Sequence, residues 1–105
     1  MKNIGELMKK AQQVQTQVNI LQTKMARQEF TGNAANGAVS VTLTGRGEAM
    51  KVHVDPSVVN PQDVETLEDL IASAMKEAAQ KASNVSEEKL KSITGGLNLK
   101  IPGLF

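Results

Sequence analysis

Histidine, cysteine and clustered carboxylates are the side chains that most often carry catalysis or bind metals, and this 105-residue sequence holds few of them. It has no cysteine and a single histidine, His53. Polar and apolar residues alternate around it from Lys51 to Asp55, which places His53 on the polar face of a strand. We therefore expect a surface histidine, no metal site built on it, and no cofactor.

Two further patterns in the sequence have residue types that could form a chemical site. Gly45-Arg46-Gly47 begins like a phosphate-binding loop, but Met50 stands where the third glycine of a G-x-G-x-x-G loop would be, so the stretch predicts a turn. Four carboxylates fall on the polar side of a helical pattern and indicate a solvated surface: Glu65, Glu68, Asp69 and Glu77. With no nucleophile, base and oxyanion donors in combination, we predict that the chain is not an enzyme.

The distribution of charge is more informative than the net charge of +1. Residues 1–51 hold seven basic and three acidic residues, a net charge of +4. Residues 52–105 hold five basic and eight acidic residues, a net charge of −3. This asymmetry permits an anionic partner at one surface without requiring one.

A long helix is predicted over residues 3–28. Its apolar residues recur with the 3-4-3-4 spacing of a heptad seam: Ile4, Leu7, Ala11, Val14, Val18, Leu21 and Met25. One interpretation is an amphipathic helix lying on its own sheet; the other has part of the helix projecting, with its seam packed on another helix. A length of roughly 40 Å exceeds what a compact domain of this size needs and favours the second interpretation.

Three short antiparallel strands should follow the helix. One is expected around Phe30 within residues 28–31, and residues 32–37 read as a turn because Asn36-Gly37 is a strong hairpin signal. The other two strands alternate over Val39–Thr44 and Met50–Asp55. The predicted inward set is Val39, Val41, Leu43, Met50, Val52 and Val54, and the predicted outward set is Ser40, Thr42, Thr44, Lys51 and His53.

A second long helix should begin at Pro61 with Asn60 as its cap, run to about Ser92, and end at Gly95-Gly96. The apolar stripe starts bulky and becomes rich in alanine. Residues 1–94 then form one α+β domain, and residues 95–105 form a tail that is either disordered or a docking segment. Its glycines and Pro102 favour a flexible tail.

The composition indicates a thin core. Two phenylalanines are the only aromatic residues, and many of the 40% hydrophobic residues are alanine. Such a chain is expected to complete its core by forming oligomers. The opening residues lack the apolar segment of a secretion signal, and no run of eighteen apolar residues occurs, so we expect a soluble cytoplasmic protein without membrane contact.

Four motifs lie between the glutamine-rich opening helix and the TGGLNL segment at 94–99. They are Thr31-Gly32-x-Ala34-x-x-Gly37-x-Val39, Gly45-x-Gly47-Glu48, Val52-x-Val54-Asp55-Pro56-Ser57 and Leu67-Glu68-Asp69-Leu70-Ile71. Together with the opening helix and the final segment, they resemble the YbaB/EbfC family of bacterial nucleoid-associated DNA-binding proteins over essentially the whole chain. Arg46 departs from the histidine or similar polar residue expected at the hairpin turn and adds a basic group there.

The resemblance implies an intertwined homodimer whose sheets associate at the centre while its helices project as arms. It also implies binding of duplex DNA in the cytoplasm, at the nucleoid, with consequences for DNA conformation or gene expression. The sequence contains no compact DNA-reading motif, so contacts should be mainly to phosphates. The candidate DNA-binding residues are Lys2, Lys9, Lys10, Lys24, Arg27, Arg46, Lys76, Lys81, Lys89 and Lys91.

A protein-interaction module remains as the alternative function. In that interpretation the helical arms bind a replication or recombination protein, and the near-neutral net charge and the alanine-rich second helix favour it.

Overall fold

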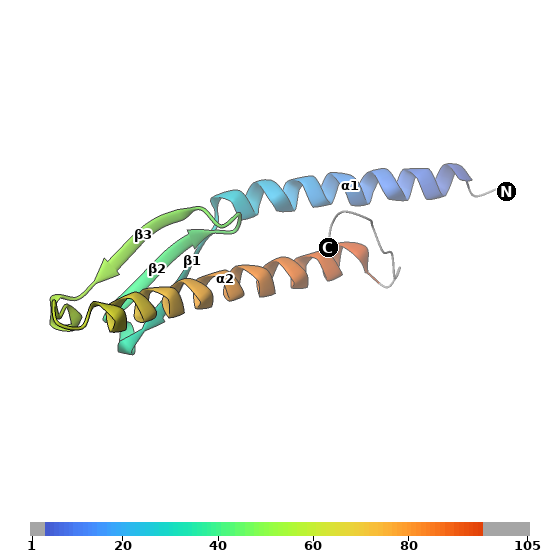
Figure 1. Ribbon diagram of the computed structural model, residues 1–105. Helices are drawn as coiled ribbons and strands as arrows, with labels where there is room; N and C mark the ends of the chain where they lie inside the picture. Colours follow the sequence, from blue (N-terminus) through green and yellow to red (C-terminus); the bar gives the residue numbers. More distant parts are fainter. Residues whose placement is uncertain (1–3, 96–105) are drawn as a thin grey trace.

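The computed structural model describes residues 4–95, and it has the predicted order of helix, three-stranded antiparallel sheet and helix (Figure 1). Lys2 and nearly all of the predicted tail, residues 96–105, lie outside the described residues. The elements in chain order are α1 Ile4–Arg27, β1 Glu29–Ala34, the 3-10 turn η1 Ala35–Gly37, β2 Val39–Thr44, β3 Ala49–Val54, the 3-10 turn η2 Pro56–Val58 and α2 Val64–Thr94. This arrangement confirms the α+β class.

The molecule is strongly elongated. Its principal extents are 71 × 20 × 19 Å and its radius of gyration is 19.3 Å, whereas a compact domain of this length has a radius of gyration of about 13 Å. The sheet lies at one end, and α1 leaves it and continues past the end of the antiparallel α2 (Figure 1).

The sheet order is β1-β2-β3, and both strand pairs are antiparallel. β1 is longer than predicted, because Gly32 pairs with Val41 inside the strand instead of opening a turn. A Cβ at Gly32 would overlap the backbone of Ala74 and Ala78 in α2. This glycine therefore permits a close approach of helix to strand, which its neighbours in the sequence do not reveal.

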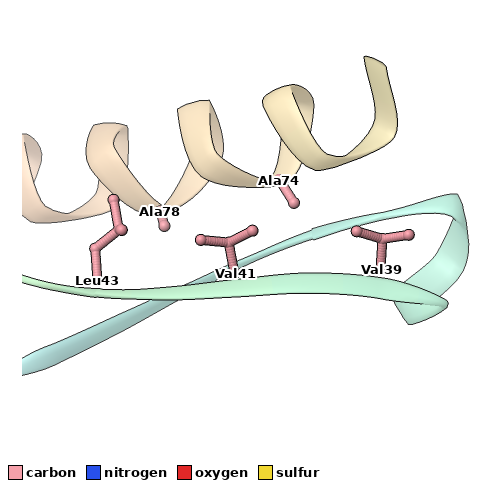
Figure 2. Packing of buried hydrophobic residues seen from close by; sticks show 5 residues of the cluster. All are labelled: Val39, Val41, Leu43, Ala74 and Ala78. Carbon is pink, nitrogen blue, oxygen red and sulfur yellow. The ribbon is translucent and has the colours of Figure 1, made fainter. Parts of the chain in front are cut away.

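The main core lies between β2 and the first half of α2. Val39, Val41 and Leu43 point from β2 toward Ala74 and Ala78, and all five are buried (Figure 2). The small alanines let the helix lie low over the sheet, so the predicted inward face of β2 and the alanine stripe of the helix are both confirmed. A second cluster joins α1 to α2 and β1: Leu21, Met25, Phe30 and Ala82, with Val85, Leu90 and Ile93 partly buried against it.

The prediction that β3 is covered on its apolar face was wrong for the single chain. Met50 and Val52 are 55% and 49% exposed. Val52 pairs with the buried Val41 and so shares its face of the sheet. α2, however, packs on β1 and β2 and leaves β3 to one side.

Thr44 also departs from its prediction, because it is buried instead of facing outward. Its hydroxyl oxygen accepts hydrogen bonds from the backbone N–H groups of Arg46 and Glu48, at 3.3 and 3.2 Å. Thr44 therefore shapes the hairpin turn, and turn geometry overrides the simple alternation of the strand.

The start of α2 is three residues later than predicted. Asp63 is the N-cap, and its carboxylate accepts hydrogen bonds from the backbone N–H and the hydroxyl of Thr66. Asn60, the predicted cap, instead accepts from the N–H of Gln62 within the preceding turn. The predicted end is confirmed, since Gly95 follows the last helical residue with φ of +59°.

Candidate nucleic-acid interface

The basic residues of α1 lie along one side of the helix. At about 100° per residue, Lys9, Lys10, Lys24 and Arg27 fall within an arc of about 100°. All four are exposed, and the arc lies beside the buried seam of Val14, Val18, Leu21 and Met25. Glu6 falls in the same arc, near the exposed start of the helix.

Two adjoining grooves between α1 and α2 bring part of this basic side together with α2. Lys24 and Lys89 line a groove of about 340 Å³, together with Gln17, Ile20, Leu21, Ser92 and Ile93. Lys10 lines a neighbouring groove of about 200 Å³, together with Gln13, Val14, Gln17 and Ile93. Because the two grooves share Gln17 and Ile93, they form one surface, which we call the lysine groove, with Lys10, Lys24 and Lys89 as its cations.

The lysine groove has the electrostatics of an anion site. The residues that line it include no carboxylate within the described part of the chain. None of its three lysines forms an ion pair with another side chain of residues 4–95. Gln13, Gln17 and Ser92 add polar groups that can donate hydrogen bonds to phosphate oxygens. Sequence reasoning missed these three, although the run of glutamines on the first helix was a visible signal.

Arg46 lies on the other side of the α1–α2 contact. It is exposed at the hairpin tip and lines a groove of about 410 Å³ with Val18, Gln22, Ser86 and others. The tip is anchored to the end of α1, because the N–H of Gly45 donates to the carbonyl oxygen of Met25 at 2.8 Å. Arg46 does not line the lysine groove, so the structure does not bring it together with those lysines. It also lines an adjoining groove in which Glu87 supplies a carboxylate.

Lys81 is engaged in the fold. Its ammonium group donates to the carbonyl oxygen of Thr31 at 2.8 Å and pairs with Glu77 at 3.4 Å. Glu77 in turn accepts from the backbone N–H of Asn33 at 3.2 Å. These side chains of α2 satisfy backbone groups at the outer edge of β1, so Lys81 is less available to a ligand than the other candidates.

The remaining candidates on α2 are exposed but lie away from the lysine groove. Lys91 follows Lys89 by two residues and therefore points to nearly the opposite side of the helix. Lys76 lies thirteen residues before Lys89, about 20 Å along the helix. Of the described candidates, the structure thus brings Lys24 and Lys89 into one groove, with Lys10 in the adjoining groove about 21 Å from Lys24 along α1.

No group of three or more histidine or carboxylate side chains in the described residues could hold a metal ion. His53 is exposed on β3. The hydrogen bond from the backbone N–H of Ser57 holds the pKa of Asp55 below its ordinary value, and this carboxylate caps the turn after β3. Within residues 4–95, no helix combines the length and the apolar character that crossing a membrane would require.

The chain is thus an elongated helix–sheet–helix protein. The model of the YbaB/EbfC DNA-binding family matches residues 1–97. The chain therefore belongs to the YbaB/EbfC DNA-binding family.

Curated relatives cover nearly the same length. A nucleoid-associated protein of Rhodococcus erythropolis is 44% identical over 102 residues, covering 97% of this chain and 91% of the relative. One of Paramagnetospirillum magneticum is 50% identical over 99 residues, covering 94% and 92%. The crystal structure of an uncharacterized protein from Helicobacter pylori shares the fold, with a TM-score of 0.74 over 88% of this chain and 97% of that one, at 20% identity.

Proposed function

We propose that this protein binds duplex DNA at the bacterial nucleoid, mainly through phosphate contacts made by the lysine groove. The observation that carries the proposal is the placement of Lys24 and Lys89 in one groove, with Lys10 in the adjoining one, and no carboxylate among the described residues that line them. Family membership supports DNA as the anion, and the relatives' designation as nucleoid-associated proteins supports the location.

Phosphate contact is favoured over base readout by the chemistry of the groove. Lysine ammonium groups on flexible stems are attracted to phosphates wherever these lie, and they do not select a base without fixed geometry. Phe30 is buried, so within residues 4–95 no phenylalanine, tyrosine or tryptophan ring is exposed for base stacking. The protein should therefore bind many sequences with similar affinity, and its affinity should fall steeply as salt rises.

A homodimer joined through β3 is part of the proposal. The two outer edges of the sheet differ: β1 is covered by Glu77 and Lys81, whereas β3 pairs on one side only within the described chain. An uncovered strand edge beside exposed apolar side chains favours association with a second strand.

The apolar surface beside β3 extends onto α2. Met75 precedes Glu77 by two residues and so points to the opposite side of the helix from the covered edge of β1. Met75 and Val64 are exposed on α2, as are Met50 and Val52 on β3. A second copy on this surface would bury these side chains and complete the thin core. It would also place two lysine grooves on one assembly, with the helices projecting as arms.

Titration of labelled duplex DNA at several salt concentrations tests the DNA-binding proposal. The variant Lys24→Gln/Lys89→Gln should bind more weakly, and the slope of log affinity against log salt should become shallower by about 0.9 for each phosphate contact removed. Lys76→Gln/Lys91→Gln removes the same charge outside the groove and is the matched control.

Two results would overturn the proposal. One is an absence of binding by the wild-type protein at micromolar concentration near 50 mM salt, since non-specific binding constants are about 10⁻⁴ to 10⁻⁶ M even at physiological salt. The other is an equal change of slope in the two double variants, which would show that net charge and not the lysine groove determines the affinity.

A further inference from the structure

The apolar seam of α1 is covered over only part of its length. Val14 and Ile93 line the same groove, and Thr94 ends α2 one residue later. Before Val14, the apolar residues Ile4, Leu7 and Met8 are 58%, 65% and 61% exposed. α2 thus covers the seam as far as its own last turn and no further (Figure 1).

The exposed residues continue the buried face of α1. Leu7 lies one heptad before Val14, and Ile4 lies two heptads before Val18, so they point to the same side as the covered seam. We call Ile4, Leu7 and Met8 the open stripe. It has the composition of a packing surface, but the described residues leave more than half of each side chain exposed.

The chain itself continues from the point where the open stripe begins. α2 runs antiparallel to α1, so at Gly95 the chain is heading along the first turns of α1 (Figure 1). The residues that follow are Leu97-Asn98-Leu99-Lys100-Ile101-Pro102-Gly103-Leu104-Phe105. Leu97, Leu99 and Ile101 alternate with polar residues, so an extended segment would present all three on one side.

The segment is long enough. Ile4 and Val14 are separated by about 15 Å along the helix, and five extended residues span about 17 Å. Because the segment is tethered beside the stripe, its effective concentration there is in the millimolar range, well above that of a separate partner at micromolar concentration.

We propose that residues 97–101 dock on the open stripe of α1 of the same chain, with Leu97, Leu99 and Ile101 against Ile4, Leu7 and Met8. Composition alone favours a flexible tail; the position and direction of the end of α2 favour a docked one. The docked segment would cover the apolar seam of α1 beyond the point where α2 ends, as far as the start of α1. The proposal does not depend on DNA binding.

The absence of cysteine makes disulfide trapping a direct test. In the full chain, Leu7→Cys/Leu99→Cys should form an intramolecular disulfide under mild oxidation, because docking brings the two Cα atoms within the distance of about 7 Å that a disulfide allows. Lys9→Cys/Leu99→Cys is the matched control, since Lys9 is exposed in the same turn but points away from the stripe. We expect at least about tenfold faster closure in the first variant, the ratio of effective concentrations for a docked and an undocked pair.

Two other outcomes would contradict the proposal. Equal closure in the two variants means that the tail has no fixed position. If a mixture of the single variants Leu7→Cys and Leu99→Cys cross-links between chains as fast as the double variant closes, the tail docks on a second copy.

A cysteine-free measurement provides an independent check. Amide hydrogen exchange over residues 4–11 should become about tenfold faster in Leu97→Ser/Leu99→Ser/Ile101→Ser, because removing the cover allows the first turns of α1 to fray. Asn98→Ser/Lys100→Ser alters the other side of the segment and should leave exchange unchanged. Unchanged exchange in the triple variant contradicts docking and leaves the stripe available to a partner protein.

Discussion

Gly32 stands where α2 crosses β1, and any larger residue there would meet the helix backbone. The obstructing atoms belong to the main chain of Ala74 and Ala78, so no side-chain rotation can make room. The close approach of helix and strand therefore depends on the absence of a single Cβ.

We predict that Gly32→Ala lowers the free energy of unfolding by about 1–3 kcal/mol, the usual cost of forcing extra volume into a packed core. Denaturation in urea followed by circular dichroism measures the change. Gly5→Ala in α1 is the control, because nothing lies within 4 Å of its Cβ position and alanine is the better helix former by about 1 kcal/mol. A loss of stability in Gly5→Ala but not in Gly32→Ala would contradict the packing argument.

Asp55 should make stability depend on pH. The N–H of Ser57, which donates to its carboxylate at 2.8 Å, lowers the pKa of Asp55 in the folded chain from the ordinary value of 3.8. The contribution of Asp55 is therefore fully present above pH 3.8 and is lost as pH falls through the lower folded pKa. The difference in stability between wild type and Asp55→Ala, measured by denaturation from pH 6 to pH 2, should shrink below pH 3.8. A difference that grows on acidification would contradict this assignment.

At the scale of elements, α2 has two roles that its amphipathic pattern does not separate. Its alanines pack on the sheet, while Glu77 and Lys81 reach the outer edge of β1. A bare strand edge invites pairing with other chains, and charged side chains at an edge are one of the ways proteins prevent it. We therefore expect Lys81 to stabilise the fold more than it contributes to DNA binding.

Because Lys81 bonds to the backbone of β1 and pairs with Glu77, we predict that replacing it affects stability more than DNA binding. Lys81→Gln should lower the free energy of unfolding by up to about 1 kcal/mol, since the pair is half-exposed and screened. It should change the salt dependence of DNA binding less than Lys89→Gln, which removes a cation from the lysine groove. Paired denaturation and salt titrations measure both effects. A larger effect of Lys81→Gln on DNA affinity would place the DNA on the β1 side of α2.

The boundaries of the elements show how local signals compete. The strand Val39–Thr44 and the end of α2 at Gly95 were predictable because their signals do not conflict. The start of α2 was misplaced because Asn60 and Asp63 are both good caps, and only the geometry of the turn decides between them. β1 was predicted too short because a glycine in a strand looks like a turn until the helix above it is known.

In this elongated molecule with a thin core, an apolar surface beside β3 remains exposed. In the homodimer we propose, a second copy buries it. Val52 is the best residue to test because it is half-exposed in the single chain, so a charge there should not unfold the chain itself.

We predict that Val52→Lys converts the dimer to a monomer at micromolar concentration, because a buried unpaired charge opposes association. Light scattering gives the mass, and circular dichroism confirms that the helices remain. His53→Lys places the same charge on the opposite face of β3 and should stay dimeric. A wild-type protein that is monomeric at this concentration, or a Val52→Lys variant that stays dimeric, would contradict association through this surface.

The order of elements, the apolar faces of the helices and of β2, and the family could all be predicted from the sequence. These follow from local periodicity, turn residues and motifs, which are properties of neighbouring residues along the chain. Tertiary structure alone decided which lysines meet. Helical periodicity places Lys24 beside the apolar seam of α1 and Lys89 beside the apolar stripe of α2. Only the packing of α1 on α2 puts both lysines in one groove. The same packing, with α2 over β1 and β2, left β3 uncovered, because one helix is too narrow to cover three strands.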